Sequence, residues 1–197
     1  GYMLVESGSP EEALAPLRRA LQIRLDVVGR MNSATLSTYS VLADAQAKRR
    51  DFENALKYAG EAREIGEELF GPLAPRARFW RQRWFSIALN EMRRFHREGD
   101  PEAARRLAVE CIAPIEEFGD MDDAPPIGRA TFAEALLYAG RVQEARAIQK
   151  ELREANFDLA IYWDTVRLID PDSPHIPPEA PQEPHSNSEP GTEPPRE

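Results

Sequence analysis

The sequence predicts an all-α protein, a right-handed superhelical solenoid of antiparallel helix pairs that ends in a capping helix. Three observations support this fold class. A pattern of small and apolar residues recurs at an interval of 42 residues. Apolar residues follow helical spacing between suitable caps and breakers through most of the chain. The last 28 residues have a different composition, and we expect them to form a disordered tail.

The recurrence is clearest between the segments 9–29 and 51–71. Positions that are 42 residues apart carry the same residue in five pairs: Ala13 and Ala55, Leu14 and Leu56, Ala20 and Ala62, Ile23 and Ile65, and Gly29 and Gly71. Weaker copies begin at Gly99 and Gly140, and both lack the closing glycine. The recurrence predicts repeated helical hairpins, each of which buries its apolar face by stacking on its neighbours.

This pattern resembles the tetratricopeptide repeat (TPR), in the longer 42-residue form found in kinesin light chains and in many bacterial proteins. The resemblance rests on the Gly-x-x-x-x-Ala corner and on small residues at set places in the second helix, and it covers residues 1 to about 155. It implies a binding scaffold in which the first helix of each pair lines a concave groove. We therefore expect no enzyme activity, no catalytic residues, no metal and no cofactor.

The first half of the chain predicts three complete helices. Residues 1–7 look like the stub of an earlier helix, which indicates the C-terminal part of a longer bacterial protein. Ser9 can cap the next helix in a capping box with Glu12, and Gly29 can close it. Gly71 and the prolines after it interrupt the chain again. The expected helices of this half cover residues 9–28, 33–48 and 52–70.

The second half predicts a long aromatic helix, two further pairs and a cap. The long helix carries large apolar side chains at helical spacing: Trp80, Trp84, Phe85, Ala88, Met92 and Phe95. Core packing between repeats explains the tryptophans better than a ligand platform does. Asp158 can cap a last helix that ends near Ile169 and covers the open end of the solenoid. The other expected helices cover residues 76–97, 101–118, 127–139 and 142–155.

Composition argues against several classes of function. The chain has a net charge of -9, and residues 170–197 carry seven acids and one arginine, so the body is only mildly acidic. General nucleic-acid binding is therefore not expected. One cysteine allows no intrachain disulfide, and no apolar run could span a membrane, so we expect a cytoplasmic protein. We assign residues 1–169 to the repeat domain and residues 170–197 to the disordered, Pro- and Glu-rich acidic tail.

Isolated reactive side chains have ordinary structural explanations. Cys111 falls on the small-residue position of its helix, which favours a packed core thiol over a nucleophile. His96 has no second His or Cys at ligand spacing, which favours a surface or groove position over metal binding. Asp120, Asp122 and Asp123 resemble part of a calcium loop, but the glycine and the closing glutamate are missing. A solvated acidic loop is the favoured interpretation.

The polar side of the long aromatic helix is the best candidate for a binding site. Four of its residues lie at spacings of four, three and four and form one row, the polar stripe: Ser86, Asn90, Arg93 and Arg97. The resemblance places the polar stripe in the groove, with Asp44 and Lys48 from the helix over 33–48. The planar fork of arginine and the amide of asparagine suit a peptide carboxylate. A solvated arginine face is the alternative.

The expected function is protein–protein interaction, in which an extended peptide or partner segment docks in the concave groove. The partner is expected to be a protein or peptide, and an acidic segment is one candidate. By analogy, such arrays sit at the C-terminal end of bacterial signalling proteins, including serine/threonine kinases. The alternative is a structural or self-association module that packs on upstream repeats or on another copy.

Overall fold

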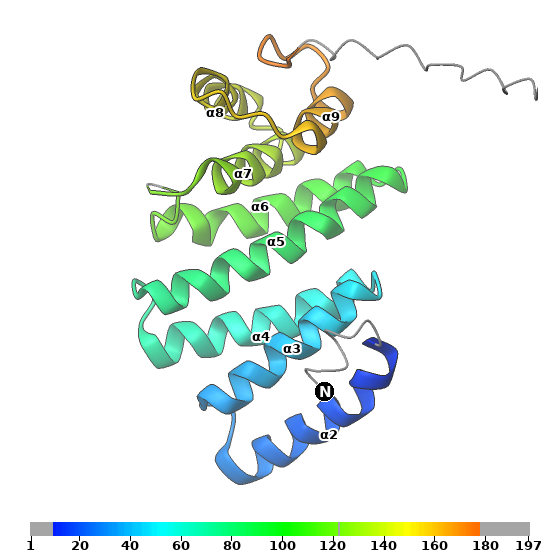
Figure 1. Ribbon diagram of the computed structural model, residues 1–197, viewed down its shortest axis with the longest axis vertical. Coiled ribbons are helices and arrows are strands. Elements are labelled where there is room, and N and C mark those ends of the chain that lie inside the picture. The colour runs from blue at the N-terminus through cyan, green and yellow to red at the C-terminus, as the bar shows by residue number, and fades with distance from the viewer. Residues whose placement is uncertain (1–9, 122, 178–197) are drawn as a thin grey trace, which may run out of the picture.

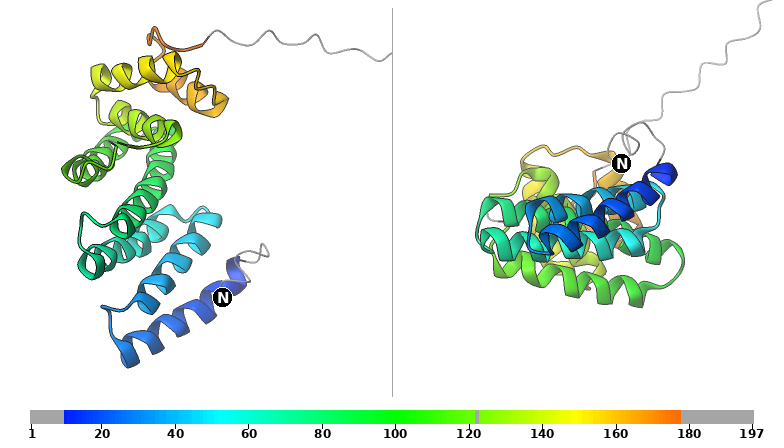
Figure 2. Two further views of the ribbon diagram at one scale, coloured as in Figure 1. Left: turned by 60° about the vertical axis from the view of Figure 1, so that its left-hand side comes forward. Right: turned by 90° about the horizontal axis from the view of Figure 1, so that it is seen from below.

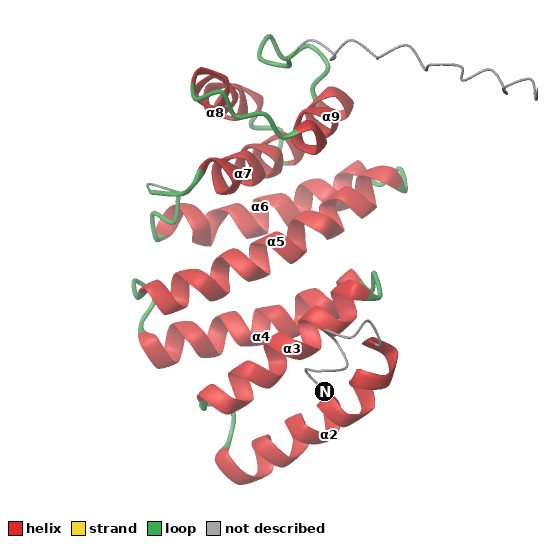
Figure 3. Ribbon diagram, viewed as in Figure 1, coloured by secondary structure: helices red, strands yellow, loops and turns green. Residues whose placement is uncertain are grey.

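The computed structural model describes residues 10–121 and 123–177. This part of the chain is a stack of helices without a β-strand, as the sequence predicts (Figures 1 and 3). The expected helix stub at residues 1–7 and Asp122 lie outside the described residues. The described helices are α2 (Pro10–Val28), α3 (Ser33–Lys48), α4 (Phe52–Phe70), α5 (Pro75–Arg97), α6 (Pro101–Glu117), α7 (Pro126–Tyr138), α8 (Val142–Glu154) and α9 (Ala160–Ile169).

The helices pair in sequence order and stack along the long axis of the molecule, from α2 at one end to α8 and α9 at the other (Figures 1 and 2). Each helix from α2 to α7 packs on the next one in the chain. In addition, α5 contacts α7 and α7 contacts α9. The pairs α3–α4, α5–α6 and α7–α8 are the repeat units. We call the side formed by α3, α5 and α7 the first-helix face, and the side formed by α4, α6 and α8 the second-helix face.

Local chemistry explains where these helices begin and end. The side chain of Asp51 accepts a hydrogen bond from the backbone N–H of Asn54, and Asp100 accepts one from Ala103, so both cap a helix N-terminus. After α4, Gly71 adopts a φ of 85°, which favours glycine. The expected cap at Asp158 is wrong, because the residue at the N-cap of α9 is Leu159, with no side-chain cap bond.

Small residues let neighbouring helices approach closely. The alanines at the repeated position of the second helices are fully or almost fully buried: Ala13, Ala55, Ala104 and Ala145. Around them, α5 supplies several large apolar side chains of the main core, including Trp84 and Met92. Since an alanine allows two backbones to come near each other, the recurrence at 42 residues marks the lines along which the helices pack.

The packed structure continues past the expected domain boundary at residues 169 and 170. Asp170 is 7% exposed and accepts hydrogen bonds from Arg146 at 2.6 and 2.8 Å. Buried Ser173 donates a hydrogen bond of 2.5 Å to Gln149, and Ile176 packs against the main core. Composition did not indicate this, because the segment is held by specific polar partners on α8. The remainder of the expected tail, residues 178–197, lies outside the described residues.

Candidate binding site

The polar stripe is a connected row of side chains on α5. Ser86 and Arg97 are exposed, while Asn90 and Arg93 are half-buried. The amide of Asn90 donates to the carbonyl of Ser86 at 3.2 Å, and Arg93 donates to the amide oxygen of Asn90 at 3.4 Å. The guanidinium of Arg97 donates to the carbonyl of Arg93 at 3.2 Å. Helical spacing brings these four side chains together as the sequence predicts.

Arg93 has a structural partner that the sequence did not indicate. Its Nε and Nη2 donate to the two carboxylate oxygens of Glu134 at 2.7 and 2.6 Å, and Glu134 on α7 is fully buried. The hydrogen bonds to Glu134 raise the pKa of Arg93 despite the opposing effect of burial. This bidentate pair ties α5 to α7 and occupies the fork that a peptide carboxylate would need. Arg97 is the stripe's other cation, and it forms no ion pair among the described residues.

Asp44 belongs to a second link across the first-helix face. It forms an ion pair with Arg83, which joins α3 to α5. Lys48 is exposed in the last turn of α3. The pocket beside the ion pair has a volume of about 410 Å³ and is lined by Ser37, Ser40, Val41, Asp44, Phe79, Trp80 and Arg83. Asp44, one of the six residues expected in the groove, therefore lines a pocket between two first helices.

A second pocket of about 410 Å³ continues from the first. The two pockets share Ser37, Phe79 and Trp80, so we treat them as one feature, the α3–α5 groove. The remaining residues of the second pocket are Ser33, Leu36, Phe70, Pro75 and Arg76. Phe79 is 53% exposed, and no motif in the sequence marks it as a groove residue. Extending the polar stripe towards the N-terminus of α5 at the same helical spacing would have reached Arg83 and then Phe79.

The isolated residues mostly lie where the sequence places them. Trp84 is 6% exposed and Cys111 is fully buried, as predicted for core residues, and burial raises the pKa of the Cys111 thiol. Trp80 is half-buried and also lines the α3–α5 groove. His96 is half-buried and meets the edge of the Tyr138 ring at a centroid distance of 5.7 Å.

The expectation of a solvated carboxylate at Asp120 is wrong. Asp120 is fully buried and accepts hydrogen bonds from Arg81 at 2.9 and 3.1 Å and from Arg78 at 3.2 Å. Arg81 is itself only 1% exposed. The two arginines come from α5, so the loop after α6 is fixed to the preceding helix pair. Its neighbour Asp123 is exposed, as predicted.

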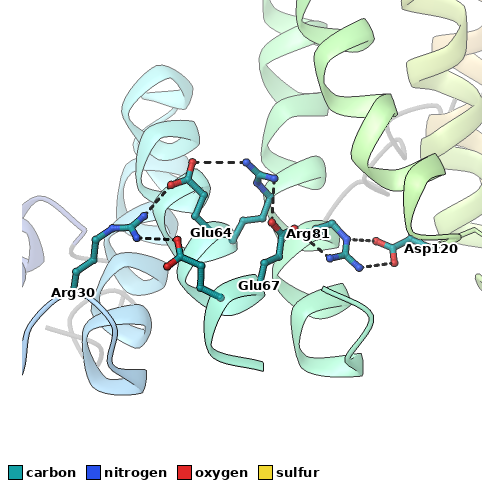
Figure 4. Close-up of polar contacts among 7 residues, drawn as sticks. Arg30, Glu64, Glu67, Arg81 and Asp120 are labelled. Carbon is teal, nitrogen blue, oxygen red and sulfur yellow. Dashed lines mark hydrogen bonds and ion pairs between the residues drawn. The ribbon is translucent and has the colours of Figure 1, made fainter. Parts of the chain in front are cut away.

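The Arg81–Asp120 pair is the end of a longer chain of ion pairs that crosses the stack (Figure 4). Arg30, in the loop before α3, bonds Glu64 of α4 at 2.8 Å. One turn further along α4, Glu67 bonds Arg81 of α5 at 3.2 Å. The chain of ion pairs links the loop before α3, the pair α3–α4 and the pair α5–α6, and it holds their spacing. Since the α3–α5 groove lies between two of these pairs, its width depends on that spacing.

Comparison with known proteins agrees with this architecture. Residues 35–72, which span most of α3 and all of α4, match the model of the tetratricopeptide repeat family. These residues therefore form a tetratricopeptide repeat. Such repeats are scaffolds that generally mediate protein–protein interaction, and they are typically not enzymes. No curated protein matches the sequence of this TPR chain.

Solved structures share the fold of this TPR protein. Two crystal structures show TPR-like repeats of a Podosopora anserina protein described as a kinesin light chain, one of them carrying a single substitution. Each superimposes on this chain with a TM-score of 0.56 and 14% sequence identity. The aligned region covers 85% of this chain and 78% or 80% of the other chain. At this identity the likeness concerns the fold alone. Among the described residues, no helix is both long and apolar enough to cross a membrane.

Proposed function

We propose that this TPR protein binds an extended segment of a partner protein along its first-helix face. The observation that carries the proposal is the α3–α5 groove, whose lining includes Phe79 and Arg83 of α5, one helical turn before the polar stripe. It combines an exposed aromatic ring, Phe79, with polar side chains and charged groups at its rim. A surface of this kind gives a bound peptide an apolar anchor and several hydrogen-bonding partners. The chain would serve as the interaction module of a larger bacterial signalling protein, such as a serine/threonine kinase.

Charge on this face favours an acidic segment. Five cations lie on the first-helix sides of α3 and α5, which are Lys48, Arg76, Arg83, Arg93 and Arg97. Two carboxylates, those of Asp44 and Glu134, neutralise Arg83 and Arg93. Arg76 and Arg97 form no ion pair among the described residues, and they mark opposite ends of α5. At a rise of 1.5 Å per residue they lie ~30 Å apart, which about nine residues of an extended peptide would cover.

A peptide titration tests this proposal. We expect a labelled peptide in which glutamate alternates with leucine to bind, and to bind more weakly at high salt because exposed charges are screened. Arg97→Gln and Phe79→Ala should each weaken binding about threefold to tenfold, as the loss of a charge or an anchor costs on the order of 1 kcal/mol. Arg105→Gln on α6 is the matched control, because Arg105 is an exposed arginine on another helix.

Equal affinity of the wild type and of the Arg97 and Phe79 variants would contradict binding on this face. Arg93 is not a suitable test position, because Arg93→Glu would place a second carboxylate against buried Glu134 and could unfold the chain. Circular dichroism of each variant shows whether the helices are retained.

One observation favours a second function, that of a structural or self-association module. Ile65 of α4 is fully buried, whereas Ile23, at the equivalent position of α2, is 52% exposed. Val27 of α2 is 75% exposed, against 36% for the equivalent Leu69. No described helix covers this side of α2 as α3 covers α4. We propose that a helix of an adjoining repeat or of another copy packs there.

Sedimentation at several protein concentrations tests the second function. If another copy packs on α2, the apparent mass should rise with concentration, and Ile23→Glu should abolish the rise. Ile161→Glu on α9 is the control, since Ile161 is a 69% exposed isoleucine on a different helix. A mass that stays constant over the whole range would exclude self-association through this face.

A further inference from the structure

A larger groove lies on the opposite side of the molecule from the polar stripe, along α4 on the second-helix face. Its volume is about 740 Å³. We call it the α4–α6 groove, because both helices form its walls and α5 contributes to its floor. The groove is lined by Glu53, Leu56 and Gly60 of α4, by Trp84 of α5, and by Leu107 and Glu110 of α6.

The lining of this groove is rich in carboxylates. Five glutamates line it, which are Glu53, Glu61, Glu64, Glu91 and Glu110. The cations among the lining residues are Lys57 and Arg63. Arg63 is held within the protein, because its guanidinium stacks 4.7 Å from the centroid of Trp84 and bonds Glu67 at 3.4 Å. The charge of the lining is therefore negative, in contrast to the first-helix face.

Two of these carboxylates are available to a ligand. Glu110 on α6 is exposed and forms no ion pair among the described residues. Glu53 on α4 pairs only with Lys57, at 2.9 Å, and these side chains are 74% and 67% exposed, so the pair is weak and easily exchanged. By contrast, Arg94 holds Glu91 and Arg30 holds both Glu61 and Glu64. The available carboxylates thus come from the two walls of the groove.

The floor offers a hydrogen-bond donor. Trp84 is 6% exposed, and its indole nitrogen is not among the buried side-chain atoms that lack a partner, so this donor is accessible from the groove. The indole nitrogen lies beside Gly60, 3.8 Å from where a side-chain Cβ would stand. Gly60 also lines the groove, so the absence of a side chain there leaves the floor open above the indole. An indole N–H that faces a groove can donate a hydrogen bond to the carbonyl of a bound peptide.

We propose that the α4–α6 groove binds a basic segment of a partner protein. Lysine and arginine side chains lay their aliphatic stems on apolar surface and extend their charged ends to carboxylates. Here the stems lie on Leu56 and Leu107, which are half-buried, and the charged ends reach Glu53 and Glu110. A backbone carbonyl of the segment accepts the Trp84 N–H. This site differs from the site proposed on the first-helix face in its location, in the charge of its lining and in the charge of the segment that it binds.

The test is fluorescence anisotropy of a labelled peptide in which arginine alternates with serine, titrated with the full chain. We expect binding that weakens at high salt. Glu53→Gln and Glu110→Gln should each weaken it about twofold to fivefold, the range expected for one exposed charge pair. Glu117→Gln on α6 changes the net charge equally at an exposed residue outside the groove, and it should leave the affinity unchanged.

A second variant tests the position of the peptide without changing any charge. Gly60 lies in regular helix, and a Cβ added there makes ordinary contact, so Gly60→Leu should fold and cover the floor. We expect it to weaken binding of the arginine peptide at least as much as either glutamate variant. Arg97→Gln should have no effect on this peptide, which separates the result from that of the first-helix face.

Three results would overturn the proposal. The first is an absence of arginine-peptide binding at low salt. The second is equal weakening by Glu117→Gln and Glu110→Gln, which would mean that an acidic protein attracts the peptide without a defined site. The third is an unchanged affinity in the Gly60→Leu variant.

Discussion

At the scale of single residues, burial decides what the titratable side chains can do. Cys111 is fully buried, and desolvation raises the pKa of its thiol. Desolvation is also the main cause of the raised pKa values of Tyr138 and Tyr162. All three groups therefore keep their protons at pH values at which an exposed group of the same kind would ionise. Since the thiolate is the nucleophilic form of cysteine, Cys111 is unsuited to nucleophilic chemistry.

The raised pKa of Cys111 predicts a loss of stability at high pH. In the unfolded chain the thiol ionises near its ordinary pKa of about 8.5, whereas in the folded chain it keeps its proton. Above that pH the unfolded state binds fewer protons than the folded state, so the free energy of unfolding falls as pH rises. The fall from this one group is about 1.4 kcal/mol per pH unit. Urea unfolding at several pH values above 8.5 should show a smaller fall for Cys111→Ala than for the wild type, and parallel falls would contradict the prediction.

The buried pair of Arg81 and Asp120 predicts a large effect of a single substitution. Asp120→Ala leaves the buried Arg81 guanidinium with Glu67 as its remaining carboxylate partner. Removing one member of a buried pair costs about 3 to 5 kcal/mol, and Glu67 should keep the loss near the lower value. The measurement is urea unfolding. Asp123→Ala is the matched control, because Asp123 is an exposed aspartate in the same loop and should have almost no effect.

At the scale of the element, α5 carries both the core and the candidate site. Its 23 residues include buried Trp84, Phe85 and Met92 on one side and the polar stripe on another. It packs on α4, α6 and α7. Its arginines form ion pairs with Glu67 of α4, with Asp120 in the loop after α6 and with Glu134 of α7. The stripe is therefore positioned by a helix that is held on several sides, which favours a preformed binding surface.

The repeated alanine of the second helices predicts overpacking when it is enlarged. Ala55 is fully buried in α4 within the main core, so Ala55→Leu should force its neighbours apart and cost about 1 to 3 kcal/mol. A thermal melt measures the loss. Ala147→Leu on α8 makes the same chemical change at an exposed helical position and should leave the melting temperature nearly unchanged. Similar melts for the wild type and Ala55→Leu would refute the proposed repeat register.

At the scale of the whole molecule, the TPR fold is held together by contacts between neighbours. Each pair packs mainly on the adjacent pairs, and the chain of ion pairs from Arg30 to Asp120 adds polar links between them (Figure 4). The two grooves lie on different faces of this stack, the α3–α5 groove between first helices and the α4–α6 groove between second helices. If both proposed sites bind as expected, one scaffold holds an acidic and a basic partner segment on different faces.

Because residues 170–177 are docked on the repeats, the effect of a C-terminal truncation on stability should depend on the residue at which the chain is cut. A chain ending at Ile169 loses the Arg146–Asp170 pair, the Ser173–Gln149 hydrogen bond and the contact of Ile176. We expect a loss on the order of 1 kcal/mol, which lowers the melting temperature of a chain of this size by about 2 to 4 °C. A chain ending at Pro177 is the control. Equal melting temperatures of the two chains would show that residues 170–177 add no stability.

The binding site was only partly predictable from sequence. Helical spacing sufficed to place Ser86, Asn90, Arg93 and Arg97 in one row, because residues three and four apart share a side of a helix. It could not show that Glu134, 41 residues further along, occupies the fork of Arg93. It also gave no sign of the α4–α6 groove, whose walls come from helices that are not consecutive in the chain.

The sequence by itself determined the helices, their pairing and the TPR architecture of this protein. Those features follow from local periodicity, caps and a repeat length, all of which are visible along the chain. Only the tertiary structure decided which charges are available to a partner. Asp120 and Glu134 look like ordinary acidic residues in sequence, yet both are fully buried against arginines of α5. The physical reason is that an ion pair depends on the distance between side chains from different helices, and residue spacing along the chain does not fix that distance.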